Sequence, residues 1–161
     1  MTMPAWWWND AVQHVGKLVL ATLLGGAIGL NRELHQKPAG FRTHAMVALG
    51  AALMTMVAVD LGARRGLNDV DAVSRVLQGI IAGIGFVGGG AILRRDSDPN
   101  VHGLTTAASI WVVAAMGSAA GLGLWLSAIV SVALALAVLT VGSRIDRAVH
   151  RIQSGRERTG P

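Results

Sequence analysis

The stretch NRELHQKPAGFRTH, residues 31–44, concentrates cationic side chains between two long apolar runs in a chain that is otherwise poor in charge. Guanidinium and ammonium groups bind carboxylates and phosphates through charge-assisted hydrogen bonds, so this stretch can form an anion site or a partner site. The bias of Lys and Arg toward the cytoplasm would give the same charges as a plain membrane anchor. The residues leave both interpretations open. The candidates are Arg32, Glu33, Lys37, Arg42, Thr43 and His44.

Within this stretch, KPAG has the pattern of a type I turn, with Pro38 at the second position and Gly40 at the fourth. Arg32 ends the preceding apolar run, where a cation interacts favourably with the negative end of a helix dipole. A tight turn at this place would bring the side chains of Arg32, Lys37 and Arg42 to one membrane depth.

A second polar stretch, DSDPNVHGLTT at residues 96–106, precedes another apolar run. Asp98 followed by Pro99 predicts a helix start, as N-cap and first helical residue. The next polar side chains serve either as capping groups or as a cluster that faces residues 31–44. We predict the second arrangement, with the arginines of residues 31–44 in contact with this segment around one polar cavity. The candidates are Asn100, Thr105 and Thr106.

Asp60 is the one acidic residue inside an apolar run, and an ionisable group within a membrane span is a functional candidate by default. It lies near the end of its run, four residues before Arg64, so a local ion pair at the membrane interface also explains it. An ion pair with Arg75, or a site for a cation or proton, stays open.

Glycines recur four residues apart along the apolar runs, a spacing that lets membrane helices approach closely. The segment GIIAGIGFVGGGAIL is the densest, and each interior glycine costs a helix about 1 kcal/mol relative to alanine. Either this segment packs tightly, at the bundle centre or against a second copy, or its helix breaks to line a solute site. The glycines expected to pack helices are Gly25, Gly29, Gly79, Gly83, Gly85, Gly88, Gly89 and Gly90.

No constellation for catalysis is present, since no Ser–His–Asp set, paired carboxylates or cluster of metal ligands falls at one membrane depth. Cysteine is absent, which excludes thiol catalysis and Cys-ligated metals. His35 and His44 flank the turn without a carboxylate or thiol suited to zinc, and we interpret them as interfacial polar residues. We therefore expect no enzymatic activity and no cofactor, while a bound cation such as magnesium stays open.

The composition indicates a membrane protein: of 161 residues, 52% are hydrophobic, only 14% are charged, and 21 are glycine. Nucleic-acid binding is rejected despite the net charge of +5, because the basic residues lie in short clusters without aromatic interleaving. A helical span of the bilayer needs about 20 mostly apolar residues. We predict an all-α, five-span helix bundle over residues 1–143, with spans at about 12–30, 45–62, 76–93, 104–120 and 122–141.

The distribution of Lys and Arg predicts the orientation of the bundle, because these residues favour cytoplasmic segments. Ten fall in 31–44, 94–103 and the tail from residue 144, against three in the connections on the other side. The N-terminus is thus expected outside and the C-terminus in the cytoplasm. The tail 144–161 reads as an amphipathic segment, disordered after Gln153, that rests on anionic lipid headgroups or docks a soluble partner.

Three linked motifs resemble the MgtC/SapB family of bacterial inner-membrane proteins. They are GxxxGLxRE with KPAGFRTH, GIGFVGGGAIL and VHGLTTAASIW, and together they cover about residues 25–111. The resemblance implies a five-span inner-membrane protein whose best-known relatives support growth in low magnesium and survival inside macrophages. The positions of this sequence that match the motif residues of the family, and to which the resemblance carries over, are Arg32, Glu33, Lys37, Pro38, Gly40, Arg42, Thr43, His44, Gly85, Gly88, Gly90, Asn100, Gly103, Thr105, Thr106 and Trp111.

The chain departs from the family pattern in two ways. Several relatives carry a cysteine just after the motif tryptophan, where this chain has Val112. The virulence-type members add a soluble C-terminal domain, whereas the sequence here stops soon after the fifth expected span. Both departures weaken transfer of the virulence role. The resemblance implies a regulator of a membrane complex such as an F-type ATP synthase, whereas Asp60 and the glycines keep open a small transporter or channel. Either form is expected to be a homodimer or small homo-oligomer.

Overall fold

Five α-helices and one short β-hairpin make up the part of the chain that the computed structural model describes, residues 5–64, 70–95 and 98–157. Side chains are described within residues 10–63, 70–92 and 101–145. The elements are α1 (Ala5–Leu34), α2 (Phe41–Arg64), α3 (Val70–Gly90), β1 (Leu93–Arg95), β2 (Asp98–His102), α4 (Leu104–Gly121) and α5 (Trp125–Glu157).

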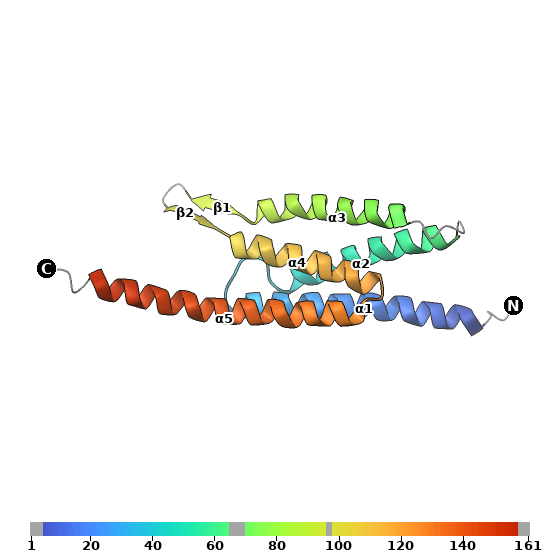
Figure 1. Cartoon of the computed structure of the whole chain (residues 1–161), viewed down its shortest axis with the longest axis horizontal. Helices are drawn as coiled ribbons and strands as arrows, with labels where there is room; N and C mark the ends of the chain where they lie inside the picture. The colour runs from blue at the N-terminus through green and yellow to red at the C-terminus, as the bar shows by residue number, and fades with distance from the viewer. Residues whose placement is uncertain (1–4, 65–69, 96–97, 158–161) are drawn as a thin grey trace.

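Each of the five helices contains a segment long and apolar enough to cross a membrane, which confirms the predicted all-α five-span architecture. The helices run alternately up and down along one axis, so α1 begins and α5 ends at opposite ends of the bundle (Figure 1). One end carries the connection 35–40, the β1–β2 hairpin and the end of α5; we call it the hairpin end. The prediction that this end faces the cytoplasm remains a prediction.

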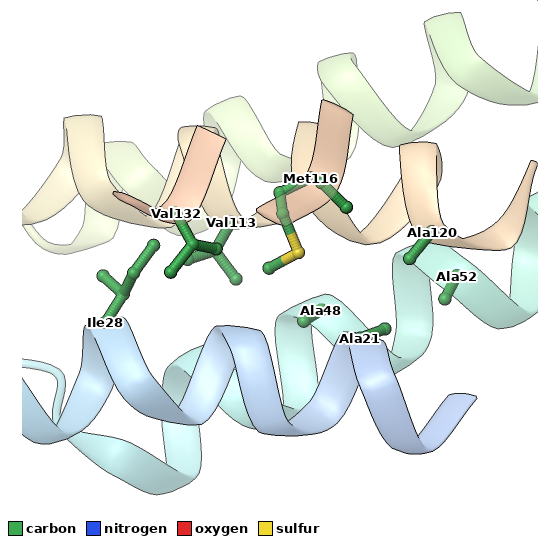
Figure 2. Close-up of a cluster of buried hydrophobic side chains, with 9 residues drawn as sticks. Ala21, Ile28, Ala48, Ala52, Val113, Met116, Ala120 and Val132 are labelled. Carbon is green, nitrogen blue, oxygen red and sulfur yellow. The ribbon is translucent and has the colours of Figure 1, made fainter. Parts of the chain in front are cut away.

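Helix α4 lies at the centre of the bundle and contacts all four other helices. Of its span, 56% is buried inside the protein, whereas no residue of the most apolar 18-residue stretch of α3 is buried. Ile28, Val113, Met116 and Val132 point toward one another between α1, α4 and α5 (Figure 2). Alanines complete the core where α1, α2 and α4 meet, and such small side chains let helix backbones approach closely. They are Ala21, Ala48, Ala52 and Ala120.

A tight turn joins α4 to α5, in keeping with the single residue left between the predicted spans 104–120 and 122–141. Gly123 takes a left-handed φ of 79°, a conformation that glycine adopts at no steric cost. The Leu124 N–H donates to the Ala119 carbonyl, and the Gly123 N–H donates to the Ala120 carbonyl. These two bonds form the Schellman pattern, which satisfies carbonyls at the end of a helix.

Two sequence predictions around α3 and α4 are wrong. The helix start expected at Asp98 and Pro99 is instead part of β2, which pairs with β1 in an antiparallel hairpin, and α4 begins at Leu104 after Gly103. Gly103 has a φ of 91°, and a Cβ there would collide with the Ala91 carbonyl. The third span also lies earlier than expected, at Val70–Gly90 rather than about 76–93.

Beyond its membrane span, α5 continues as one helix to Glu157, past Gln153, where the sequence suggested disorder. The side chains of its last turns, from Asp146, lie outside the described set. The proposed contact of this basic segment with anionic headgroups therefore stays a prediction.

Candidate functional site

The connection between α1 and α2 is held by backbone hydrogen bonds at the end of α1. The Lys37 N–H donates to the Arg32 carbonyl and the Gln36 N–H to the Glu33 carbonyl, a second Schellman pattern, with Gln36 at φ 54°. Ala39 has a φ of 58°, whereas a type I turn needs a negative φ at this position. The predicted type I turn at KPAG is therefore wrong, although the connection is as short as expected.

Glycines of α1 hold the start of α2 close to α1. A Cβ on Gly25 would lie 2.7 Å from the His44 carbonyl oxygen, and one on Gly29 would lie 2.8 Å from the Phe41 Cα. At the same place, the Phe41 N–H donates to a Glu33 carboxylate oxygen over 2.9 Å, which caps the first turn of α2. The predicted packing role of Gly25 and Gly29 thus fits the geometry, and it places His44 against α1.

Arg32 reaches from the end of α1 to the first turn of α4. Its side chain is 5% exposed, and Nη2 donates to Thr106 Oγ1 over 2.6 Å. Its Nε is buried without a hydrogen-bond partner, and no carboxylate among the described side chains forms an ion pair with it. A buried charge is normally compensated by an opposite charge or by several hydrogen bonds. This guanidinium is therefore only partly satisfied.

His44 joins α2 to α4 one turn deeper in the bundle. It is fully buried; Nδ1 lies 3.0 Å from the Gly40 carbonyl oxygen, and Nε2 lies 3.0 Å from Ser109 Oγ. A neutral imidazole satisfies both contacts if Nδ1–H donates to the carbonyl and Nε2 accepts the Ser109 hydroxyl. The Ser109 hydroxyl also lies 2.8 Å from the Thr106 carbonyl, and its single hydrogen can serve either acceptor. Polar groups from three helices are thereby linked.

We call Arg32, His44, Thr106 and Ser109 the buried polar cluster. The expected contact between the 31–44 stretch and the 96–106 segment is present through Arg32 and Thr106. The other described candidates do not join it, because their side chains are exposed. These are Glu33, Lys37, Arg42, Thr43 and Thr105. The side chain of Asn100 lies outside the described residues.

Asp60 lies away from this cluster, toward the opposite end of the bundle, and pairs with a residue that the sequence did not single out. Its Oδ2 is 3.3 Å from His14 Nε2, with side chains 46% and 39% exposed, respectively. Arg75 is exposed and forms no ion pair with Asp60 in the described part of the chain. The expected partner Arg64 has a side chain outside the described set. The described contact thus links α1 to α2.

The α3 glycines behave unlike those of α1. Helix α3 is continuous through Gly90, so the alternative in which this helix breaks to line a solute site is wrong. Tight packing within the described chain is also wrong for most of this segment, since Gly88 alone among its glycines has a close neighbour there, Ala107 of α4. A Cβ would meet nothing within 4 Å at Gly79, Gly83, Gly85, Gly89 and Gly90.

Sequence reasoning missed Ser109 and His14. A signal existed for Ser109, because it lies three residues after Thr106 and therefore on the same face of α4. For His14 the signal was weaker: α1 and α2 run antiparallel, so the start of one and the end of the other fall at one depth. No group of three or more potential metal-binding His, Asp or Glu side chains occurs among the described residues.

The model of the MgtC family matches residues 18–148 of the chain. SrpB of Synechococcus elongatus is 42% identical over 137 residues, which cover 81% of this chain and 75% of SrpB. YhiD of Escherichia coli K12, described as a proposed magnesium transporter, is 39% identical over 80% of this chain and 60% of its own length. MgtC of Salmonella typhimurium LT2 is 37% identical over 86% of this chain.

The chain thus spans three quarters of SrpB and only 55–60% of YhiD and MgtC. No solved structure matches the chain significantly.

Proposed function

Since the chain belongs to the MgtC family, we propose that it is an inner-membrane protein of magnesium homeostasis that acts by binding another membrane protein complex. The names of two relatives support the first part, because one is a proposed magnesium transporter and the other is MgtC itself. Binding to another membrane protein complex is supported by the outer face of α3.

The observation that carries the regulatory proposal is the unpartnered outer face of α3. Gly79, Gly83 and Gly90 lie on one side of this helix with no atom of the described chain near them, and Phe86 projects among them at 87% exposure. Lipid tails gain little from glycine, whereas a second helix can pack its backbone directly against it. A small-residue face with one large apolar side chain therefore suits a helix of another protein.

The competing proposal of a transporter or channel loses the two features that kept it open, the α3 glycines and Asp60. The α3 helix is unbroken, so it frees no backbone carbonyls to bind an ion, and Asp60 lies near one end of the bundle beside His14. A cavity of about 240 Å³ does lie between α3 and α4. Its lining, including Ile80, Ile84 and Trp111, is almost wholly apolar, with Ser118 as the polar exception, and offers poor ligands to a cation.

Affinity purification in a mild detergent from magnesium-starved cells tests the proposal. The wild type is expected to recover a membrane complex that Gly83→Ile loses, because an isoleucine would block close approach of a helix to α3. Ala133→Ile is the matched control, since Ala133 is an exposed small residue of the α5 span. Recovery of the chain and lipid alone from the wild type, or equal recovery by Gly83→Ile, would contradict the regulatory function.

A cysteine at position 86 identifies what covers the α3 face, because the chain has no cysteine of its own. After oxidation of membranes that contain Phe86→Cys, a cross-link to a different protein supports the proposal. A cross-linked product at twice the mass of the chain alone would assign the face to a second copy instead. Magnesium flux into liposomes that exceeds flux into empty vesicles, and that Asp60→Asn abolishes, would favour the transporter.

A further inference from the structure

The buried polar cluster leaves one strong hydrogen-bond donor unused. Arg32 Nε is buried without an acceptor, and the same guanidinium directs Nη2 at Thr106 in the first turn of α4. An unmatched donor in a low-dielectric interior is costly, and a charged one more so. An acceptor from outside the chain, such as a bound ion, is one way to satisfy such a group.

The first turn of α4 supplies further donors that have no acceptor among the described residues. Its N-cap, Gly103, has no side chain to accept a hydrogen bond, and the first backbone bond of the turn is from the Ala107 N–H to the Gly103 carbonyl. The N–H groups of Leu104, Thr105 and Thr106 therefore have no backbone acceptor within the described chain. The Leu104 and Thr105 side chains are exposed, so the outer side of this turn lies at the protein surface.

We propose that the first turn of α4 and the Arg32 guanidinium together bind a phosphate group. A helix N-terminus presents several N–H groups and a partial positive charge to an anion. A guanidinium adds a rigid fork of donors that matches phosphate oxygens. Arg32 is the second, independent element of the site, because it comes from α1 and is held against α4 by the Thr106 hydroxyl.

Two sources can supply this phosphate. The turn lies at the hairpin end, where the spans end and where the phosphates of lipid headgroups are found (Figure 1). Inorganic phosphate or a phosphorylated metabolite in the aqueous phase carries the same chemistry. The site uses no part of the α3 face, so it stands or fails separately from the proposed function.

Thermal unfolding of the purified full chain in dodecyl maltoside, a detergent without phosphate, tests the site. Sodium phosphate is titrated against sodium chloride at equal ionic strength, and phosphatidylglycerol is compared with diacylglycerol, which has the same tails without phosphate. Saturation of the site is expected to raise the melting temperature by about 5 °C. Arg32→Met should abolish this rise, whereas Arg144→Met, which removes an exposed arginine of α5, should keep it.

A rise with inorganic phosphate that depends on Arg32 supports the site and assigns it to soluble phosphate. A rise with phosphatidylglycerol alone, again lost in Arg32→Met, supports the site and assigns it to a lipid headgroup. If Arg32→Met fails to fold, Arg32→Lys replaces it: this variant keeps the charge without the fork and should lower the rise by at least half. No rise from either ligand, or a rise that persists in the Arg32 variant, overturns the proposal.

Discussion

Two glycine-rich regions of this bundle have opposite surroundings. Where α1 and α4 meet α2, most of the glycines lie against backbone: a Cβ on Gly25 or Gly117 would overlap the backbone of His44 or Ala48, respectively. On α3, a Cβ on Gly79 or Gly83 would meet nothing within 4 Å. The same spacing in the sequence therefore serves close packing within the chain in one region and leaves an open face in the other. A glycine motif predicts close approach of a helix but not which chain provides it.

The largest effect is expected from Gly117→Ala, which adds one methyl group in the packed region. That methyl would overlap the Ala48 backbone carbonyl, and backbone cannot move aside as a flexible side chain can. We expect the free energy of unfolding to fall by about 3 kcal/mol, at the upper end of overpacking effects. Unfolding by sodium dodecyl sulfate in mixed micelles, followed by circular dichroism, measures it. An unchanged transition would show that α2 and α4 are not packed as described.

A smaller loss is expected from His44→Ala, which tests the polar part of the same packed region. The substitution removes two hydrogen bonds and leaves a buried void beside Ser109. We expect it to lower the free energy of unfolding by about 2 kcal/mol, measured by the same titration.

The control for this substitution is His35→Ala. The His35 ring also contacts a backbone carbonyl, that of Asn31 at 2.7 Å, but its side chain is exposed. We expect a loss below about 0.5 kcal/mol. Equal losses for the two histidines would contradict a special role for the buried one.

The sequence predicted the packed region better than the open one, for a physical reason. Long apolar runs with short connections require antiparallel neighbouring helices, so residues 31–44 and 96–106 had to meet at one end. The contact between Arg32 and Thr106 follows from this topology, because a buried guanidinium needs a hydrogen-bond acceptor. Ser109 was missed because its spacing from Thr106 places it on the same face of α4 but does not show that this face turns toward His44 of α2.

The sequence alone did not predict which face of α3 is left open, or that a β-hairpin rather than a helix start follows this helix. Each glycine lowers the stability of a helix by the same amount, whether the close contact that offsets this loss comes from the same chain or from another protein. The polar residues 93–102 read as a helix start because Asp98 and Pro99 match that pattern, yet pairing of Leu93 with His102 closes a hairpin there. Strand pairing depends on the residues of two separate segments, whereas a helix-start pattern is read from one segment alone.

The opposite sign is expected for Gly83→Ala, the same substitution made in the open region. With no atom near the new methyl group, the only remaining effect on the isolated chain is the higher helix propensity of alanine. We expect the free energy of unfolding to rise by up to about 1 kcal/mol in detergent, where the partner is absent. A loss instead of a gain would mean that the chain's own residues cover this face, and the contrast with Gly117→Ala would disappear.

The smallest effect is expected from breaking the contact between Asp60 and His14, which lies outside both glycine regions. Both side chains are more than a third exposed, so water screens the pair and each side chain gives up rotational freedom to form it. A double-mutant cycle with Asp60→Asn and His14→Gln should give a coupling free energy below about 1 kcal/mol in detergent. The buried polar cluster offers the comparison, since its members are shielded from water and linked across three helices. A coupling above about 2 kcal/mol would show that the pair is enclosed when the protein is folded, and Asp60 would again be a candidate ion site rather than a surface contact between α1 and α2.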